Sequence, residues 1–594
     1  MKDFYAVDFE TFYDKEYSLS KMSPWNYVFH EKFDAYLVAV YGEDISFVGH
    51  PSEFDWAKLD GKTLIMHNAG FDGLVVKRLQ ADGMIDPSLD LSNLVDTADM
   101  VVWLKAPRAL KGASKELLGR DMDKAVRDKM KGKTYKDMVS AGGEEDLLKY
   151  GIGDAVNTYD LWVGFSDKWP EKERIASRMN REAGWYGFMV NKGLVNSGLV
   201  TLNQKLFDTE KNIPWIDEGE KPLSPKAIRA HGRKEGIPVP ASLAKDNPVT
   251  LAWAKQYGEK CPWIKATSEW RSVNMLRTRV QAISNNIRED GTMPYSCKYY
   301  GAHTGRFSGG GEAKGGAFNM LNQPRKAMFG VDVRPMFIAR PGHKLIISDL
   351  AQIEARLLLW RVGDTAFLDI LREEGNLYQA YARKTGFYTG TGKFKDDDLD
   401  GYNLTKARVL GLGFGCGDKR FREMAETQYG VILTAQQAKE AVQGFRDENP
   451  LICKHWWSHQ VHLRLSANAR DKTHEVELRS GRDLVYFDPQ LTGDREVKVR
   501  FERGGNLRKV YGGLLTENEI QATARDVLID GMVAIDKAGY RYLLSVYDEI
   551  VVEVPEAKAE DAAREVPYLM THSSPWAEGC PLDTETHISD CYLK

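Results

Sequence analysis

Apolar runs that end in acidic residues mark the clearest candidates for β-strands. One run, KLIISDLAQIEAR, carries Asp349. Another, LLSVYDEIVVEV, carries Asp548 and Glu549. Both predict buried strands, and strand ends line the clefts of α/β and α+β sheets. If the two strands are neighbours, their carboxylates can hold two divalent cations roughly 3.5–4 Å apart, the apparatus of phosphoryl or nucleotidyl transfer.

A second acidic set lies near the N-terminus. The strand-like segment FYAVDFETF places Asp8 and Glu10 on one face, because side chains alternate along a strand. The strand predicted in LIMHNAGFDGLVV is followed by Asp72. In LLKYGIGDAVNTYDLW, Tyr150 and Asp154 are four residues apart and share one helical face.

An acidic pair at one strand end alone is most often a solvated turn. The three elements together predict a second two-metal site, which would activate water against a phosphodiester. The hydroxyl of Tyr150 would orient that water.

Composition sets the broad class of protein. The 594 residues require several domains or subdomains, and 43% hydrophobic with 28% charged residues is an ordinary globular balance. The net charge of −4 neither favours nor excludes nucleic acid. No apolar run is long enough to span a bilayer, and the N-terminus lacks signal-peptide features. Six scattered cysteines without a CxxC pair predict a reducing, cytoplasmic setting without structural zinc.

The motifs DFET, HNAGFD and YGIGD resemble those of DEDD-type 3′–5′ exonucleases with tyrosine in the last motif. The resemblance implies four metal ligands and a water-positioning tyrosine. By position these are Asp8, Glu10, Asp72, Asp154 and Tyr150.

The later segments resemble family A DNA polymerases. In that family the arginine of the pattern at TGRFS reaches the minor groove, and here it is Arg306. Such a donor tests base-pair shape without reading sequence. The resemblance also implies DNA contacts by Asn319 and Asn322 of NMLNQP, Gln521 of ENEIQATARDVL, and Tyr547.

DLAQIEAR resembles motif A of the same family. This implies that Asp349 and the carbonyl of Leu350 hold metal, with Asp548 as the second carboxylate ligand and Glu549 beside it. Gln352 and Glu354 then belong to the nucleotide site, where Glu354 crowds a 2′-hydroxyl and selects deoxynucleotides.

YNLTKARVLGLGFGCG resembles motif B, the fingers helix. Lys406 falls on the lysine that contacts the triphosphate, a compact cation against developing negative charge. Tyr402, Leu410 and Phe414 fall on other nucleotide-site positions. Leu410 replaces an aromatic residue, and we expect it to alter discrimination between deoxy- and dideoxynucleotides. Without the family, the glycines suggest a loop.

Three tyrosines depart from the family pattern. Tyr547, Tyr402 and Tyr378 stand where the family has positive or potentially positive groups. Lys406 would then carry more of the triphosphate charge. The candidates to assist it are Arg383, Lys384 and Arg408. The departures suggest a divergent, bacteriophage-type lineage.

The implied fold is α/β plus α+β and multidomain, with a ribonuclease H-like exonuclease domain followed by a right-hand polymerase. The expected domains are an exonuclease domain (1–165), thumb and linker helices (166–300), palm with motif A (301–365), fingers with motif B (366–514) and palm with motif C (515–594).

Three histidines in CKHWWSHQVHL form a further candidate site. His455, His459 and His462 recur at helical spacing and could bind zinc. No acid or cysteine close in sequence completes the set, so an amphipathic surface is the favoured interpretation, with the metal site as the alternative.

The resemblance implies a monomeric, template-directed DNA polymerase with a proofreading 3′–5′ exonuclease. It implies primer-template DNA and deoxynucleoside triphosphates as partners, and two Mg²⁺ per site, which Mn²⁺ could replace. Two alternatives remain. One is an exonuclease whose second half only grips DNA. The other is a replisome scaffold with both sites inactive.

Overall fold

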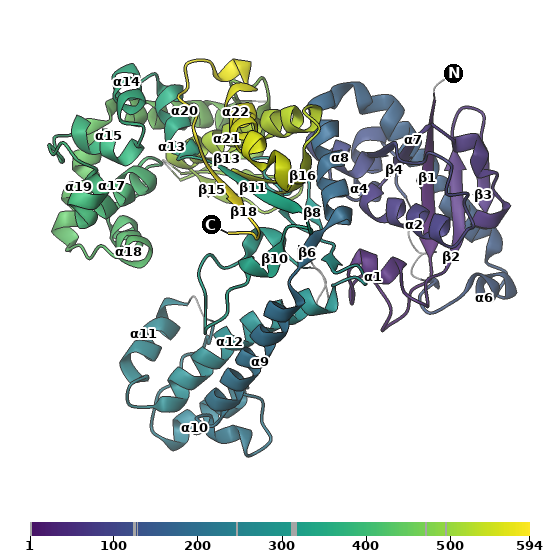
Figure 1. The fold of residues 1–594 in the computed structure, drawn as a ribbon, viewed down its shortest axis with the longest axis horizontal. Helices are drawn as coiled ribbons and strands as arrows, with labels where there is room; N and C mark the ends of the chain where they lie inside the picture. The colour runs from purple at the N-terminus through teal and green to yellow at the C-terminus, as the bar shows by residue number, and fades with distance from the viewer. Residues whose placement is uncertain are drawn as a thin grey trace.

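The computed structural model describes residues 3–122, 126, 129–244, 247–310, 318–469, 472–493 and 496–593. In Figure 1 an N-terminal α/β unit lies on one side, a cluster of helices on the other, and an antiparallel sheet between them. A pair of long helices projects below the centre. Within the described residues no helix combines the length and apolarity needed to cross a membrane.

The N-terminal unit is built on a five-stranded sheet in the order β3-β2-β1-β4-β5. The central strand β1 pairs antiparallel with β2 and parallel with β4. Helices α2 and α7 pack against β1. The bounds are β1 (Phe4–Thr11), β2 (Ala35–Tyr41), β3 (Ser46–Gly49), β4 (Thr63–Met66), β5 (Leu94–Asp96), α2 (Ala69–Ala81) and α7 (Glu144–Phe165).

Helix α8 (Glu171–Tyr186) leads from this unit to the projecting pair, α9 (Lys192–Glu210) and α12 (Pro262–Asn285). The two long helices pack along each other, and α10 (Pro225–Lys234) and α11 (Pro248–Tyr257) lie at their far end. A core of tryptophans holds that end together, comprising Trp215, Trp253 and Trp263.

The central sheet has the order β16-β17-β11-β18. Strand β11 (His343–Leu350) lies between β17 (Glu549–Pro555) and β18 (Thr584–Ser589), and β16 (Arg541–Val546) forms the edge. All its pairings are antiparallel. Helix α22 (Ala559–His572) packs on this sheet, and the long helix α21 (Gly512–Lys537) packs on α22. Both acid-tipped segments form strands, as predicted, and the structure places these strands in one sheet.

The helices of residues 353–468 form the cluster drawn in green in Figure 1. They are α13 (Ile353–Val362), α14 (Thr365–Glu374), α15 (Leu377–Lys384), α16 (Phe394–Asp397), α17 (Leu399–Leu412), α18 (Asp418–Tyr429), α19 (Ala435–Glu448) and α20 (Pro450–Asn468).

A four-stranded antiparallel sheet follows α20, and the motifs did not predict it. Its strands are β12 (Thr473–Glu477), β13 (Asp483–Thr492), β14 (Glu496–Arg500) and β15 (Arg508–Val510). Alternate side chains of these strands share one apolar core with Leu463 of α20 and Leu515 of α21. The segment expected to be fingers thus contains a sheet beside its helices.

Candidate active sites

Three acids predicted near the N-terminus meet in space. Asp8 and Glu10 lie two residues apart on β1, and Asp154 lies on α7, which packs against that strand. One carboxylate oxygen from each lies within 4.8 Å of the others. Three carboxylates this close suit a hard divalent cation, which prefers oxygen ligands and offsets their mutual repulsion. The donor set therefore fits the predicted Mg²⁺.

Asp72 joins this site from the first turn of α2. It is 4% exposed. Burial, followed by the negative charges of Asp96 and Glu10, raises the pKa of Asp72 well above its usual range. An ionised Asp72 is therefore costly until a positive charge arrives.

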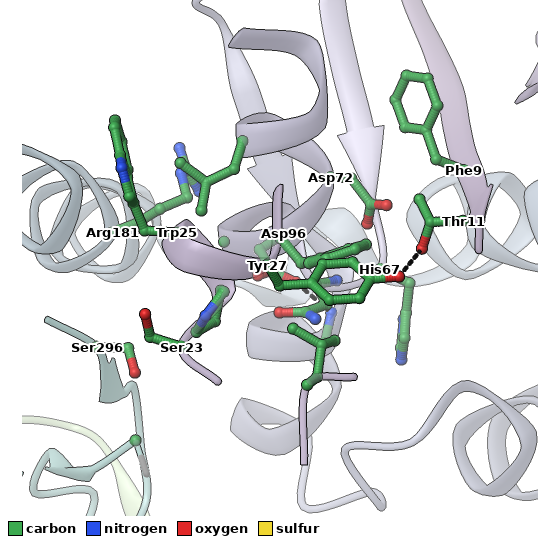
Figure 2. Close-up of a pocket in the computed structure, with 18 of the residues that line it drawn as sticks. Phe9, Thr11, Ser23, Trp25, Tyr27, His67, Asp72, Asp96, Arg181 and Ser296 are labelled. Atoms are coloured by element: carbon green, nitrogen blue, oxygen red, sulfur yellow. Dashed lines mark hydrogen bonds between the residues drawn. The ribbon is translucent and has the colours of Figure 1, made fainter. Parts of the chain in front are cut away.

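These acids line a cavity of about 960 Å³, which Tyr150 also borders. Its other wall comes from later residues, among them Arg181 and Ser296. Figure 2 shows Asp72 and Asp96 in the same cavity as Ser296. The site is thus a hollow between the N-terminal unit and the segment that follows it, with room for a polar ligand.

Further polar residues of this cavity escaped the sequence analysis. Asp96 accepts hydrogen bonds from the backbone amides of Asn68 (3.0 Å) and Ala98 (2.9 Å). Asp99 accepts from Arg108 (2.7 Å) and from the Ser177 hydroxyl (2.6 Å). Burial and the charge of Asp96 raise the pKa of Asp99 to about 6. In the sequence these residues are marked only by Asp96, which ends the short apolar run LVD. An acid at that place is also typical of an ordinary helix cap.

The central sheet brings the other predicted acids together. Asp349 of β11 lies directly opposite Glu549 of β17 in the antiparallel register. The backbone amide of Leu350 donates to the carbonyl of Asp548 (3.1 Å). Asp548 itself occupies the two-residue turn between β16 and β17, next to Tyr547, whose φ is +60°. Segments 199 residues apart are therefore neighbours through their backbones.

The three acids of this sheet are not equivalent. Asp349 and Asp548 are half-buried, whereas Glu549 is 1% exposed. The Glu549 carboxylate accepts a hydrogen bond from the hydroxyl of Tyr592 (2.6 Å). The Glu549 side chain is therefore packed in the core against Tyr592. This contact does not support the predicted grouping of Glu549 with the metal-binding acids.

Arg306 and Glu354, predicted to contact DNA and the nucleotide sugar, form an ion pair. The guanidinium of Arg306 donates to the carboxylate of Glu354 at 2.6 Å. It also lies over the ring of Tyr547, 5.9 Å from the ring centre. Gln352, which begins α13 with φ +48°, accepts from Arg356 (3.3 Å). Four predicted contacts to substrate therefore cluster at one end of α13 and the β16–β17 turn.

The other predicted DNA contacts are accessible. Asn319 and Asn322 are exposed, and the side chain of Asn319 caps the short helix Met320–Asn322 through the amide of Leu321 (3.1 Å). Gln521 of α21 donates to Glu517 (3.3 Å). The glycine-rich residues 311–317 lie outside the described residues.

Helix α17 carries the fingers motif. Its glycines do not prevent a helix, which includes Gly411 and ends at Leu412. The Lys406 ammonium lies 5.8 Å from the ring centre of Tyr378, and that ring meets Tyr402 edge-on at 5.5 Å. Burial raises the pKa of Tyr378, so this phenol is neutral in the physiological range. Leu410 and Phe414 are partly buried against the main core.

Each cation proposed to assist Lys406 already has an acidic partner. Arg383 pairs with Glu374. Lys384 pairs with Asp364 (2.8 Å), and Arg408 pairs with Glu448 (3.1 Å). None of the three is therefore favoured by its contacts as a second phosphate ligand.

The histidine helix differs from the expected amphipathic surface. His462 is exposed, but His459 is buried and His455 is half-buried. Glu519 of α21 meets both rings. The acid missing from the local sequence is thus supplied by a helix 60 residues further on.

The sequence model of DNA polymerase family A matches residues 244–594, and the chain belongs to this family. The match includes the central sheet and the helix cluster described above.

Individual relatives agree. The DNA polymerase of Bacillus phage SP02 is 30% identical over 285 residues, which are 44% of this chain and 43% of that protein. DNA polymerase I of Pseudomonas aeruginosa is 25% identical over 407 residues, 65% of this chain and 40% of that one. The matched regions thus span less than half the length of these two relatives.

Among solved structures, the polymerase domain of Pol1 from M. smegmatis, in complex with DNA primer-template and dNTP, has a TM-score of 0.70 at 17% identity. It covers 100% of this chain and 96% of that one. The shared fold confirms the predicted multidomain polymerase architecture.

Proposed function

We propose that the protein is a template-directed DNA polymerase with a 3′–5′ proofreading exonuclease. The observation that carries the proposal is the register of the central sheet, which sets Asp349 beside the Asp548–Glu549 strand in a chain of family A. The exonuclease half rests on the convergence of Asp8, Glu10 and Asp154.

In the polymerase site, Asp349, Asp548 and the carbonyl of Leu350 would hold two Mg²⁺. Bound there, Mg²⁺ makes the primer hydroxyl a better nucleophile and neutralises charge on the triphosphate. Lys406 places a cation against the triphosphate from the fingers. Glu354 excludes the 2′-hydroxyl of a ribonucleotide. Arg306 releases its hydrogen bond to Glu354 and donates instead to a base edge in the minor groove.

In the exonuclease site, Asp8, Glu10, Asp72 and Asp154 would hold the cations. Tyr150 orients the attacking water. The primer 3′ end would occupy the cavity between the N-terminal unit and the following segment.

A matched primer-template assay with Mg²⁺ tests the proposal. The parent chain should extend the primer when deoxynucleoside triphosphates are present and shorten it when they are absent. Asp349→Ala should lose extension and keep degradation, and Asp8→Ala should do the reverse.

The same assay separates the alternatives. A parent chain that degrades the primer but never extends it would show a nuclease with a DNA-gripping half. A folded chain that does neither would show a scaffold. Either result would reject the proposed polymerase.

A further inference from the structure

Three side chains outside the two proposed active sites meet between α20 and α21. The Nε2 atoms of His455 and His459 lie 2.7 and 2.9 Å from the same carboxylate oxygen of Glu519, Oε2. The two rings belong to successive turns of α20, and their centres are 4.6 Å apart. Three atoms that commonly bind metals therefore point at one place, within 4.8 Å of one another.

The other oxygen of Glu519 is held elsewhere. Oε1 accepts from the guanidinium of Arg361, which lies on α13. Glu519 is 1% exposed. Arg361 thus fixes the orientation of this carboxylate, the role that outer hydrogen-bond partners play at metal ligands.

A third imidazole, outside this cluster, belongs to the strand that follows α20. His474 of β12 is buried, its Nδ1 lies 3.0 Å from the hydroxyl of Ser466, and its Nε2 has no hydrogen-bond partner among the described residues. Burial lowers the pKa of His474 to about 4. The ring is therefore neutral at physiological pH and lies outside the three-ligand set.

We propose that His455, His459 and Glu519 form a binding site for a divalent transition-metal ion of the zinc class. Two imidazole nitrogens four residues apart on a helix, with one carboxylate oxygen from a second helix, make a three-ligand zinc set that leaves a further coordination position. Mg²⁺ is disfavoured there, because it prefers oxygen ligands.

The position of the site assigns it a structural role. Its ligands come from α20, which ends the fingers helices, and α21, which packs on the palm, while Arg361 extends the contact to α13. A bound ion would fasten the base of the fingers to the palm. None of its ligands is a proposed catalytic acid, so it would stabilise the fold without taking part in nucleotidyl transfer.

The test measures zinc bound to the full-length, metal-stripped protein by equilibrium dialysis in excess Mg²⁺, which fills the carboxylate sites. We expect one Zn²⁺ per chain in the parent protein and none in His455→Gln, His459→Gln or Glu519→Gln. His462→Gln is the matched control, because His462 is an exposed histidine of the same helix, and it should keep one Zn²⁺.

Thermal unfolding provides a second readout that does not depend on activity. Zn²⁺ should raise the melting temperature of the parent and of His462→Gln and leave that of His455→Gln unchanged. If His459→Gln fails to fold, the measurement on His455→Gln decides the outcome, because His455 is only half-buried. A parent chain without bound zinc, or undiminished zinc in a folded His455→Gln variant, would overturn the proposal and leave the cluster as a hydrogen-bonded ion network.

Discussion

The two carboxylate sites of this protein are assembled in different ways. In the N-terminal unit the acids come from a strand and two helices, and three of their side chains already meet in a cavity. In the central sheet the backbone pairing of β11 and β17 sets the acids side by side, while the surrounding residues are engaged with one another. In the first site the buried acids repel one another, and bound cations would offset that repulsion. In the second site the sheet fixes the acids, and a bound substrate would replace the ion pair between Arg306 and Glu354.

The largest expected effect distinguishes the roles of two adjacent acids of the central sheet, Asp548 and Glu549. Asp548→Asn should reduce primer extension by more than about a thousandfold, a loss of more than roughly 4 kcal/mol of transition-state stabilisation. Glu549→Gln should cost about tenfold, as for a supporting residue, because its carboxylate is bound by Tyr592 inside the core. Single-turnover extension rates measure both. Equal losses would return Glu549 to the metal-facing set.

The next effect concerns the cations of the fingers. Lys406→Ala should slow nucleotide incorporation by about a hundredfold, because its ammonium forms no ion pair within the described residues and, in the proposed function, is the cation that faces the triphosphate. Lys384→Ala is the matched control, since Lys384 is already paired with Asp364.

Incorporation rates over a range of triphosphate concentrations give the result for both variants. A loss in Lys384→Ala as large as that in Lys406→Ala would show that the ion pairs of the fingers open to bind phosphate.

A smaller effect is expected where Arg306 exchanges partners. Arg306→Ala should weaken primer-template binding by about tenfold, within the range of one good base-edge contact. Glu354→Gln should not weaken it, because loss of the carboxylate charge releases Arg306 for DNA. Fluorescence anisotropy with a labelled duplex measures both affinities. A weakened Glu354→Gln variant would mean that the ion pair itself organises the DNA site.

The smallest effect tests the strain in the N-terminal site through stability. The pKa of Asp72 is raised on folding, so its contribution to stability is greatest at low pH and is lost as the pH rises through that raised pKa. In the absence of metal, Asp72→Asn should therefore melt a few degrees above the parent at pH 8, with a difference that shrinks towards pH 4.

Calorimetry with and without Mg²⁺ checks this prediction. Added Mg²⁺ should narrow the difference at pH 8, because the bound cation relieves the repulsion in the parent chain. A variant that melts below the parent at pH 8 without metal would show that Asp72 is ionised and stabilised there by contacts other than a cation.

Much of both sites could be predicted because their chemistry lies in short segments. Apolar runs that end in Asp8 or Asp349 indicated strands and their acidic ends, and the structure places these acids on β1 and β11. The strand pattern leaves open whether β11 pairs with the strand after Asp548, and the structure shows that it does.

Long-range contacts could not be predicted in the same way. Glu519 reaches His455 only through the packing of α20 on α21, and no local spacing records that contact. The same holds for the ion pairs that engage Arg408 and Lys384, and for the buried Asp99. These features depend on which helix faces meet, which periodicity within one element does not determine.

A primer with a mismatched 3′ end tests the central claim, that one chain holds two independent carboxylate sites, most directly. With Mg²⁺ and all four deoxynucleoside triphosphates, the parent should remove the mismatch and then extend. Asp349→Ala should remove it and stop, and Asp8→Ala should leave it in place while still extending a matched primer. Removal of the mismatch by Asp8→Ala at the parent rate, or loss of both activities in either single variant, would contradict the account.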